Sequence, residues 1–295
     1  MIAFPTIQII VGIPGSGKTT YCKEQLNKSK RFVHISSDNI RKEILGTEQD
    51  QSDNNAVFSI MQERTLSALQ KGQSVLYDAT NLTRKDRLKI ISACPAYVQK
   101  EAIICWAPIE ICIKRDLNRN RTVGKDIIDK MLKRFQAPFF DEGFDRIFVK
   151  KPDDWSDKEM EKYCYELFKK DINQDNPHHT LSLQKHMQTA YEYLITNHVN
   201  DIELLSAACW HDIGKLYTKT FINTKGEKTA IAHYYGHQGY SAWISYGFNA
   251  SNIVTIAWLI STHMDLYLNT KYYRALPEFL KHPLDLLHEA DVNAH

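Results

Sequence analysis

The segment GIPGSGKT at residues 12–19 decides the fold of this chain. It is a complete G-x-x-x-x-G-K-T pattern, and it stands between the apolar run of residues 7–11 and a helical pattern that starts at Lys18. Glycines at such a turn let backbone N–H groups surround phosphate oxygens, while the helix N-terminus adds partial positive charge. The pattern predicts a site for ATP or another nucleoside triphosphate with Mg²⁺, in which Lys18 reaches the β/γ oxygens and Thr19 ligates the ion. The residues expected to bind the nucleotide are Gly12, Gly15, Ser16, Gly17, Lys18, Thr19 and Thr20.

Around this loop, short β-branched apolar runs alternate with helical patterns over the first 150 residues. Alternation of this kind is typical of βαβ units and predicts an α/β domain with a parallel sheet. A dinucleotide-binding fingerprint is excluded, because no third glycine follows Gly15 and Gly17 at the required spacing. We expect strands at residues 7–11, 32–35, 74–78, 102–106 and 146–149, and helices at 18–26, 39–45, 55–70, 84–92, 109–118 and 125–135.

The pattern changes near residue 150, where polar and proline-containing stretches indicate a linker. We therefore expect a P-loop domain at residues 1–150, a linker at 151–176 and a second domain at 177–295. Amphipathic segments without any strand pattern predict that this second domain is all-α. The chain ends four residues after Asp291, so the final helix is expected to be very short or truncated. The segments expected to be helical are 183–197, 202–210, 237–246, 251–262 and 284–294.

Composition separates the two halves further. The chain has 295 residues, of which 43% are hydrophobic, so two folded domains are expected and a disordered chain is excluded. Residues 1–150 carry 24 Lys+Arg against 17 Asp+Glu, whereas the remainder carries 13 against 18 and 11 of the 12 histidines. A basic balance favours phosphate-rich ligands, and clustered histidine and aspartate favour metal.

Neither a membrane nor a disulfide framework is expected. No apolar stretch approaches the roughly 20 residues of a membrane span, and the six cysteines form no C-x-x-C pair. These observations predict a cytoplasmic protein without a membrane partner, and they leave its oligomeric state open.

Asp38 follows the second expected strand, in the segment SSDNIR at residues 36–41. A carboxylate at that edge of the sheet, beside the phosphates, can accept the proton of an acceptor hydroxyl. The alternative is that Asp38 only caps the helix expected from Asn39. Arg41 lies one helical turn further and is expected to face the same cleft, where it can pair with an anionic group on the acceptor.

On these residues, the first 150 positions resemble the bacteriophage-type polynucleotide 5′-kinase family, in which the P-loop and second strand are followed by D-x-x-R. The resemblance implies that Asp38 is the general base and that Arg41 holds the phosphate flanking the 5′-hydroxyl. Ser37 stands where that family often has a basic residue, so contacts to the acceptor backbone are expected to differ.

Two further motifs carry this resemblance. The D-x-T-N strand end of the family is matched by Asp78, Thr80 and Asn81, which are expected near the substrate. The R-x-x-x-R of its basic lid helix is matched by Arg115 and Arg119, which would clamp the donor phosphates and stabilise charge on the transferred group. Two alternatives stay open: Asp78 orders Mg²⁺ through water, and the arginines are a solvated helix face.

His211 and Asp212 are adjacent in the second half, and a metal ion would supply the common point to which both side chains turn. Other histidines and an aspartate accompany this pair in a fixed order. The series resembles the HD phosphohydrolase superfamily over most of residues 175–295. Its members here are His186, His211, Asp212, His237, His263 and Asp291.

The HD resemblance implies one ion bound by His186, His211, Asp212 and Asp291, and a second created by His237 and His263. Two adjacent cations would hold a bridging hydroxide and neutralise a phosphate ester under in-line attack. Imidazole and carboxylate suit Mn²⁺, Co²⁺, Ni²⁺, Zn²⁺ or Fe²⁺, and the sequence does not choose among them. Three further residues are expected at the substrate: Lys215 on a phosphate oxygen, His179 ahead of the first ligand, and His233, which is also the alternative to His237 as a ligand.

Together the two resemblances imply a bifunctional end-healing enzyme that phosphorylates 5′-OH ends and hydrolyses 2′,3′-cyclic or 2′/3′-phosphate ends. RNA is favoured over DNA, and a separate ligase would seal the products because the chain has no K-x-D-G motif. Two alternatives remain: a nucleoside or small-metabolite kinase fused to an HD nucleotidase, and an HD hydrolase regulated by the P-loop.

Overall fold

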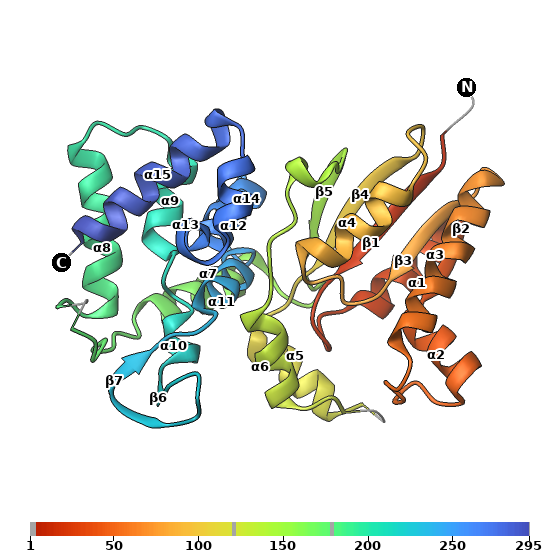
Figure 1. Ribbon diagram of the computed structural model, residues 1–295, viewed down its shortest axis with the longest axis horizontal. Helices are drawn as coiled ribbons and strands as arrows, with labels where there is room; N and C mark the ends of the chain where they lie inside the picture. The colour runs from red at the N-terminus through yellow and green to blue at the C-terminus, as the bar shows by residue number, and fades with distance from the viewer. Residues whose placement is uncertain (1–3, 120–121, 178–179, 295) are drawn as a thin grey trace. The chain divides into compact units, whose positions relative to one another are not determined.

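The computed structural model describes residues 4–119, 122–177 and 180–294 (Figure 1). Its contacts divide the chain into two compact units. The first comprises Met1–Asp129 and Pro138–Pro152, and the second comprises Lys130–Ala137 and Asp153–His295. In the described residues, no helix is both long and apolar enough to cross a membrane.

The first unit is built on a five-stranded sheet in which every neighbouring pair is parallel. The strand order is β2-β3-β1-β4-β5 (Figure 1). All six residues of β1 and all five of β3 are buried, which explains why most residues of these strands are apolar. The expected parallel α/β fold is confirmed. The strands are β1 (Thr6–Val11), β2 (Phe32–Ser36), β3 (Ser74–Asp78), β4 (Gln99–Cys105) and β5 (Arg146–Lys150).

Helices alternate with these strands along the chain. α1 and α3 both pack against β2 and β3, whereas α2 packs against α3. A short 3₁₀ turn, η1 (Phe140–Glu142), precedes β5. The helices are α1 (Lys18–Lys28), α2 (Ser37–Leu45), α3 (Asn54–Gln70), α4 (Arg84–Ala93), α5 (Ile109–Leu117) and α6 (Lys125–Lys133).

The second unit is mainly helical. Its centre is formed by α8, α9, α12 and α15, since α8 packs against α9 and α15, and α9 packs against α12. Trp243 and Tyr240 of α11 are among its largest fully buried side chains. The helices are α7 (Asp157–Phe168), α8 (Leu183–Thr196), α9 (Ile202–Trp210), α10 (Lys215–Thr218), α11 (His237–Ser245), α12 (Ile253–Thr262), α13 (Asp265–Leu268), α14 (Thr270–Ala275) and α15 (Glu278–Asn293).

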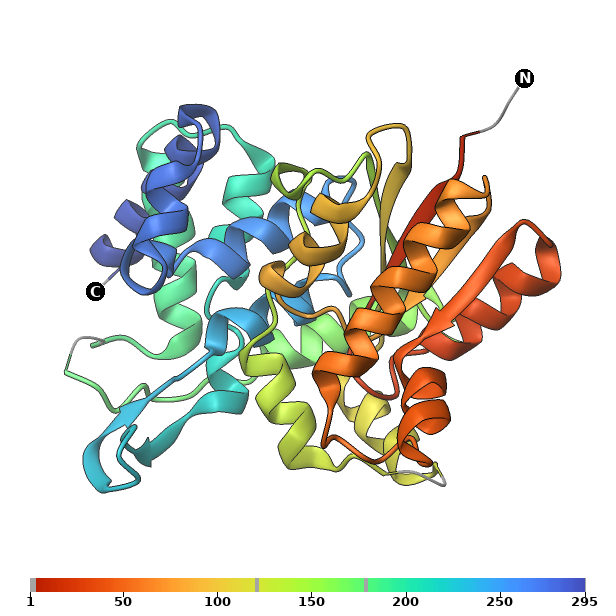
Figure 2. The ribbon, with the colours of Figure 1, turned by 45° about the vertical axis from the view of Figure 1, so that its right-hand side comes forward.

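The expectation of an all-α second domain is wrong, because this unit also contains an antiparallel hairpin (cyan in Figure 2). Its strands are β6 (Thr220–Ile222) and β7 (Lys228–His233). Gly226 closes the intervening turn with φ of 84°. Most residues of both strands are exposed or half-buried, so they lack the apolar–polar alternation by which a strand is read from sequence.

Two other expectations need correction. The expected linker contains α7, whose start is fixed by a capping box in which Ser156 and Glu159 bond each other's backbone N–H. The final helix is not short: α15 has 16 residues and begins well before Pro283, which lies inside it. A proline within a helical pattern predicts a helix boundary, so the expected start at residue 284 differs from the observed start at Glu278.

Candidate functional site

The phosphate loop connects β1 to α1 and depends on glycine at two points. Gly15 has φ of 78°, and a Cβ there would lie 2.2 Å from the carbonyl oxygen of Cys112. A Cβ on Gly12 would lie 2.5 Å from the Oγ of Ser16. Both contacts are far closer than side chains tolerate, so the path of this loop requires glycine.

Lys18 turns back over the loop. Its Nζ donates to the carbonyl oxygens of Gly12 at 2.7 Å and Ile13 at 2.9 Å. Burial lowers the pKa of Lys18, although the charge of Asp78 opposes this effect. Thr19 and Thr20 are exposed at the start of α1. The Oγ of Ser16 is buried and has no hydrogen-bond partner among the described residues.

Asp38 and Arg41 lie together on α2. The N-cap of this helix is Ser36, whose hydroxyl accepts from the backbone N–H of Asn39, so the alternative that Asp38 is the cap is wrong. The Oδ1 of Asp38 accepts from the Nη1 of Arg41 at 2.8 Å. Arg41 is 5% exposed, donates to Asn54 at 3.1 Å, and has a buried Nε without a partner among the described residues. The structure thus provides a buried cation directly beside a carboxylate that is 52% exposed.

The residues that follow β3 support the loop. The backbone N–H of Gly12 donates to the carbonyl oxygen of Thr80 at 3.1 Å, and the amide of Asn81 donates to that of Ile10 at 2.7 Å. Asn81 is buried, so its hydrogen bond to Ile10 holds the segment after β3 against β1. The Oδ2 of Asp78 lies 2.9 Å from the Nε2 of His34.

Sequence reasoning missed the ion pair behind this segment. Arg87 is fully buried, forms two bonds of 2.8 and 2.6 Å with the Glu142 carboxylate, and donates to the carbonyl oxygen of Asn81 at 3.1 Å. Because both partners are buried and lie 55 positions apart, no local sequence signal reveals them.

Replacing Arg87 with alanine should lower the free energy of unfolding by roughly 3–5 kcal/mol, because it leaves the carboxylate of Glu142 buried with weak compensation. Urea denaturation followed by circular dichroism measures this change. Arg64→Ala is the control: Arg64 pairs with Glu43 at 2.6 Å and both side chains are exposed, so its removal should cost about 1 kcal/mol or less. Equal losses in the two variants would contradict this account.

The two lid arginines differ in position. Arg115 lies on α5, and its Nη1 is 3.5 Å from the carbonyl oxygen of Gly15. Arg119 is not on this helix, because α5 ends at Leu117, and the expectation of one helix carrying both is therefore wrong. The charge of Arg119 nevertheless contributes to lowering the pKa of Lys18. Close to this helix end, the Asp116 carboxylate accepts from the backbone N–H groups of Val123 and Gly124, which precede α6.

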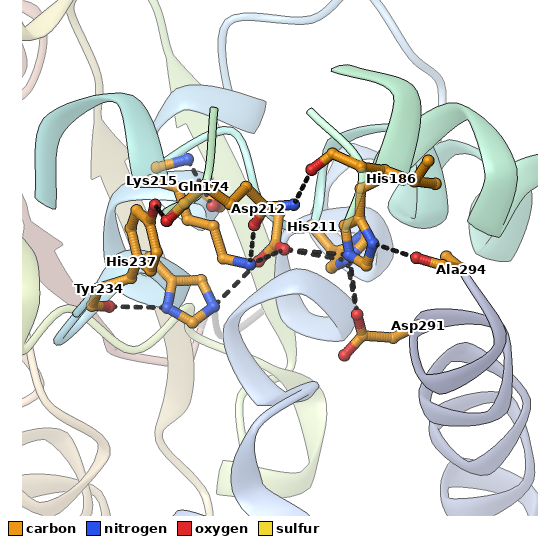
Figure 3. A network of polar contacts seen from close by, with 12 residues as sticks. Gln174, His186, His211, Asp212, Lys215, Tyr234, His237, Asp291 and Ala294 are labelled. Atoms are coloured by element: carbon orange, nitrogen blue, oxygen red, sulfur yellow. Dashed lines mark hydrogen bonds and ion pairs between the residues drawn. The ribbon is translucent and has the colours of Figure 1, made fainter. Parts of the chain in front are cut away.

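The second candidate site lies in the helical unit and collects side chains from five segments of the chain (Figure 3). Two groups, each within 4.8 Å, share Asp212. One contains His186 on α8, His211 after α9, and Asp291 on α15, and the other contains His237 on α11 and His263 after α12. Thus the structure brings together the six residues that the sequence selected as metal ligands.

The two oxygens of Asp212 face different neighbours. Its Oδ2 lies 3.3 Å from the Nε2 of His186 and 3.5 Å from that of His211. Its Oδ1 lies 3.0 Å from the Nε2 of His237 and 3.9 Å from that of His263. The Oδ1 of Asp291 completes the first group at 3.0 Å from His186 and 3.3 Å from His211. A carboxylate in this position can bridge two cations.

The other ring nitrogen of each imidazole is fixed by the backbone. The Nδ1 atoms of His186, His211, His237 and His263 lie 2.7–2.9 Å from the carbonyl oxygens of Ala294, Ala208, Tyr234 and Ile260. Since a carbonyl only accepts, each Nδ1 carries the hydrogen, and each Nε2 turns a lone pair toward the carboxylates in the neutral form.

This arrangement of acceptors fits a divalent metal. The Nε2 atoms of His237 and His263 are 3.2 Å apart, and neutral rings would place no hydrogen between them. Burial lowers the pKa of His186, but hydrogen bonds with Asp212 and Asp291 outweigh burial and raise that pKa to about 10. A positive charge among these acceptors is therefore favourable, and Lys215 supplies one at 2.5 Å from the Oδ2 of Asp212. The donor set of imidazole and carboxylate suits first-row transition ions.

Lys215 closes one side of the site. Its Nζ lies 2.5 Å from the Oδ2 of Asp212 and donates to the Oε1 of Gln174 at 2.8 Å (Figure 3). Gln174, which the sequence did not single out, also accepts through its backbone carbonyl from the hydroxyl of Tyr234. His233 ends β7, stacks on Tyr235 and is not part of either ligand group, whereas His179 lies outside the described residues.

Relatives of this chain match it over about half of its length. Transcription factor bHLH140 of Arabidopsis thaliana is 27% identical over 149 residues, which are 48% of this chain and 15% of that protein. L-seryl-tRNA(Sec) kinase of Methanococcus maripaludis is 28% identical over 146 residues, which are 44% of this chain and 52% of the relative. The chain therefore spans at most about half the length of these curated relatives.

Two solved structures are similar over part of the chain. One is the Pnkp1/Rnl/Hen1 RNA repair complex, with 23% identity, a TM-score of 0.41, and coverage of 44% of both chains. The other is a fungal RNA kinase, with 19% identity, a TM-score of 0.39, and coverage of 54% of this chain and 81% of that one. A family model described as an AAA domain matches residues 7–138. This match covers the phosphate loop and strands β1 to β4 apart from Thr6, so the first unit is an α/β domain with a phosphate loop.

Proposed function

We propose that this chain heals broken RNA ends by phosphorylating 5′-hydroxyl groups with ATP and Mg²⁺ and by hydrolysing 2′,3′-cyclic or 2′/3′-phosphate groups. We assign the first reaction to a domain at residues 1–150 and the second to an HD phosphohydrolase domain at 177–295. The products would be 5′-phosphate and 3′-hydroxyl ends, which a separate ligase can join. Its six free cysteines are consistent with work in the cytoplasm.

In the kinase reaction, the glycine-rich loop would bind the triphosphate through backbone N–H groups, with Lys18 released from its carbonyl contacts to the β/γ oxygens. Thr19 would ligate Mg²⁺. Asp38 would take the proton of the acceptor hydroxyl as the new P–O bond forms. Arg115 and Arg119 would stabilise the charge that spreads over the transferred group.

The observation that carries the choice of acceptor is Arg41. Arg41 is 5% exposed, and its buried Nε has no hydrogen-bond partner within the described part of the chain, while its Nη1 contacts the proposed base. Burying a cation is costly unless it meets anions, and Asp38 is one such anion. The phosphate beside a 5′-terminal hydroxyl would be the second anion that the Arg41 guanidinium contacts. A free nucleoside has no such group.

Arg41→Ala should weaken phosphorylation of a 3′-phosphorylated oligonucleotide about ten- to a hundredfold more than that of a free nucleoside, which corresponds to one charged hydrogen bond. The measurement compares kcat/KM for the two acceptors. Arg64→Ala is the matched control, because it removes an exposed cation that pairs with Glu43. Equal loss on both acceptors would favour the alternative, a nucleoside or small-metabolite kinase.

In the phosphoesterase reaction, His186, His211, Asp212 and Asp291 would hold one transition ion, and His237 and His263 would hold another together with Asp212. Such ions supply a hydroxide at neutral pH and neutralise phosphate oxygens. The protein's part is to fix each Nε2 through the backbone carbonyl bonded to Nδ1. Lys215 would give up its hydrogen bond to Gln174 and donate to a phosphate oxygen instead. His233 and His179 are proposed to contact the substrate.

A further inference from the structure

A different set of metal-binding side chains lies in the first unit, and no sequence motif pointed to it. Cys22 of α1, His34 of β2 and Asp78 of β3 each offer a ligand atom, and these atoms lie within 4.8 Å of one another. The imidazole and carboxylate are already 2.9 Å apart. Sulfur, nitrogen and oxygen donors therefore meet at one point.

The strand pairing explains why these residues meet. β2 and β3 are parallel neighbours, with His34 paired to Leu76 and Ser36 paired to Asp78. Alternate residues of a strand point to the same face, so His34 and Asp78 share the face of Leu76. Cys22 belongs to the buried cluster that contains Leu76, which places α1 on that face too.

The chemistry of the set favours zinc over magnesium. Thiolate, imidazole and carboxylate are the usual ligands of Zn²⁺, whereas Mg²⁺ prefers oxygen. Bond lengths of about 2.0–2.3 Å in a tetrahedral site would place the ligand atoms roughly 3.3–3.7 Å apart, within reach of small side-chain movements. Cys22 is fully buried, while the side chains of His34 and Asp78 are 21% and 10% exposed, so an ion can enter from their side.

We propose that Cys22, His34 and Asp78 form a transition-metal site, with Zn²⁺ as the preferred ion and water in the fourth position. On binding, the ion replaces the thiol hydrogen of Cys22, which leaves to solvent as a proton. Asp78 ends β3, and two residues later the carbonyl oxygen of Thr80 accepts from the backbone N–H of Gly12 in the phosphate loop at 3.1 Å. Because an ion bound to Asp78 would hold this segment beside the phosphate loop, it would inhibit phosphate transfer; this consequence, unlike the binding itself, rests on the proposed kinase function.

Titration of the full chain with Co²⁺ tests the site, because only cysteine ligands give thiolate-to-cobalt charge-transfer absorption in the near ultraviolet. The histidine cluster contains no cysteine, so its own cobalt binding is silent in this band. We expect the absorption to reach a plateau once this site and the silent histidine cluster are filled, to disappear in Cys22→Ala, and to need at least tenfold more Co²⁺ in His34→Ala. Cys105→Ala should retain the charge-transfer absorption, because it removes a different thiol of the buried cluster that also contains Cys22.

Absence of this absorption in the natural chain, or its persistence in Cys22→Ala, would overturn the site. His34→Ala keeps the test valid if the cysteine variant does not fold, because His34 is partly exposed. In a second experiment, Zn²⁺ is added to kinase assays with Mg²⁺ in excess. Inhibition of the natural chain but not of His34→Ala is expected. Equal inhibition of both would remove the regulatory consequence, and absence of kinase activity would count against the proposed function alone.

Discussion

Asp212→Asn should reduce hydrolysis of 2′,3′-cyclic phosphate ends about a thousandfold or more. The two carboxylate oxygens of Asp212 face the two ligand groups, at 3.0 Å from His237 and 3.3 Å from His186. The amide of asparagine removes the negative charge that the two ligand groups share. It also turns an N–H group toward one of them, where a carboxylate oxygen accepts in the natural chain. Loss of several kcal/mol of metal-based stabilisation corresponds to a factor of this size. Hydrolysis rates and metal content, measured by mass spectrometry, are the readouts.

The control for this variant is His282→Ala. His282 is exposed and lies on α15, the helix that carries Asp291, but it is not part of the cluster. It should leave both metal content and hydrolysis unchanged. An Asp212→Asn protein that keeps its metal and its hydrolysis would show that the cluster is not the phosphoesterase site.

Asp38→Asn should lower kcat for phosphorylation of a 5′-hydroxyl RNA by about 10²–10⁴, the usual contribution of a general base. The amide oxygen can still accept from Arg41, so the 2.8 Å contact and the position of that guanidinium should survive. We therefore expect little change in KM for ATP. Transfer of labelled γ-phosphate to the RNA measures the effect.

Glu43→Gln is the matched control, since Glu43 lies on the same helix and pairs with exposed Arg64 at 2.6 Å. It should retain nearly full activity. ATP hydrolysis without an acceptor should be measured in parallel. Hydrolysis that persists in Asp38→Asn, with no labelled RNA from either the variant or the natural chain, would favour the P-loop as a regulator of the hydrolase.

The first unit was largely predictable because its signals are local. β1 and β3 are completely buried, so their apolar runs stand out, and the phosphate loop fixes the junction that follows β1. The hairpin of the second unit gave no such signal. Its strand β6 has three residues and none of them is buried.

The exact ends of helices were harder to predict, because neighbouring side chains compete for the same backbone N–H groups. The sequence offers Asp38 as a cap for a helix expected from Asn39, and only the structure shows that the helix begins at Ser37 with the hydroxyl of Ser36 as its cap. Similarly, only the structure shows that α5 ends at Leu117, two residues before Arg119.

Within the histidine cluster, the sequence indicated which residues meet but not how each ring is held. Three rings bond the carbonyl oxygen three residues earlier, as His211 does with Ala208, and such contacts are local. The fourth, His186, uses Ala294, which lies 108 positions away. The pairing of Cys22 with His34 and Asp78 also depends on strand order, which the residues alone do not specify.

The most direct measurement uses an RNA with a 5′-hydroxyl and a 2′,3′-cyclic phosphate, incubated with the full chain, ATP, Mg²⁺ and Mn²⁺, an ion that binds thiolates weakly. Both ends of the product are then read by mass spectrometry. The account predicts a 5′-phosphate together with a 3′-end that has lost its cyclic phosphate, and it predicts that Asp38→Asn and Asp212→Asn each abolish one change without the other. An RNA that keeps both original ends under these conditions would contradict it.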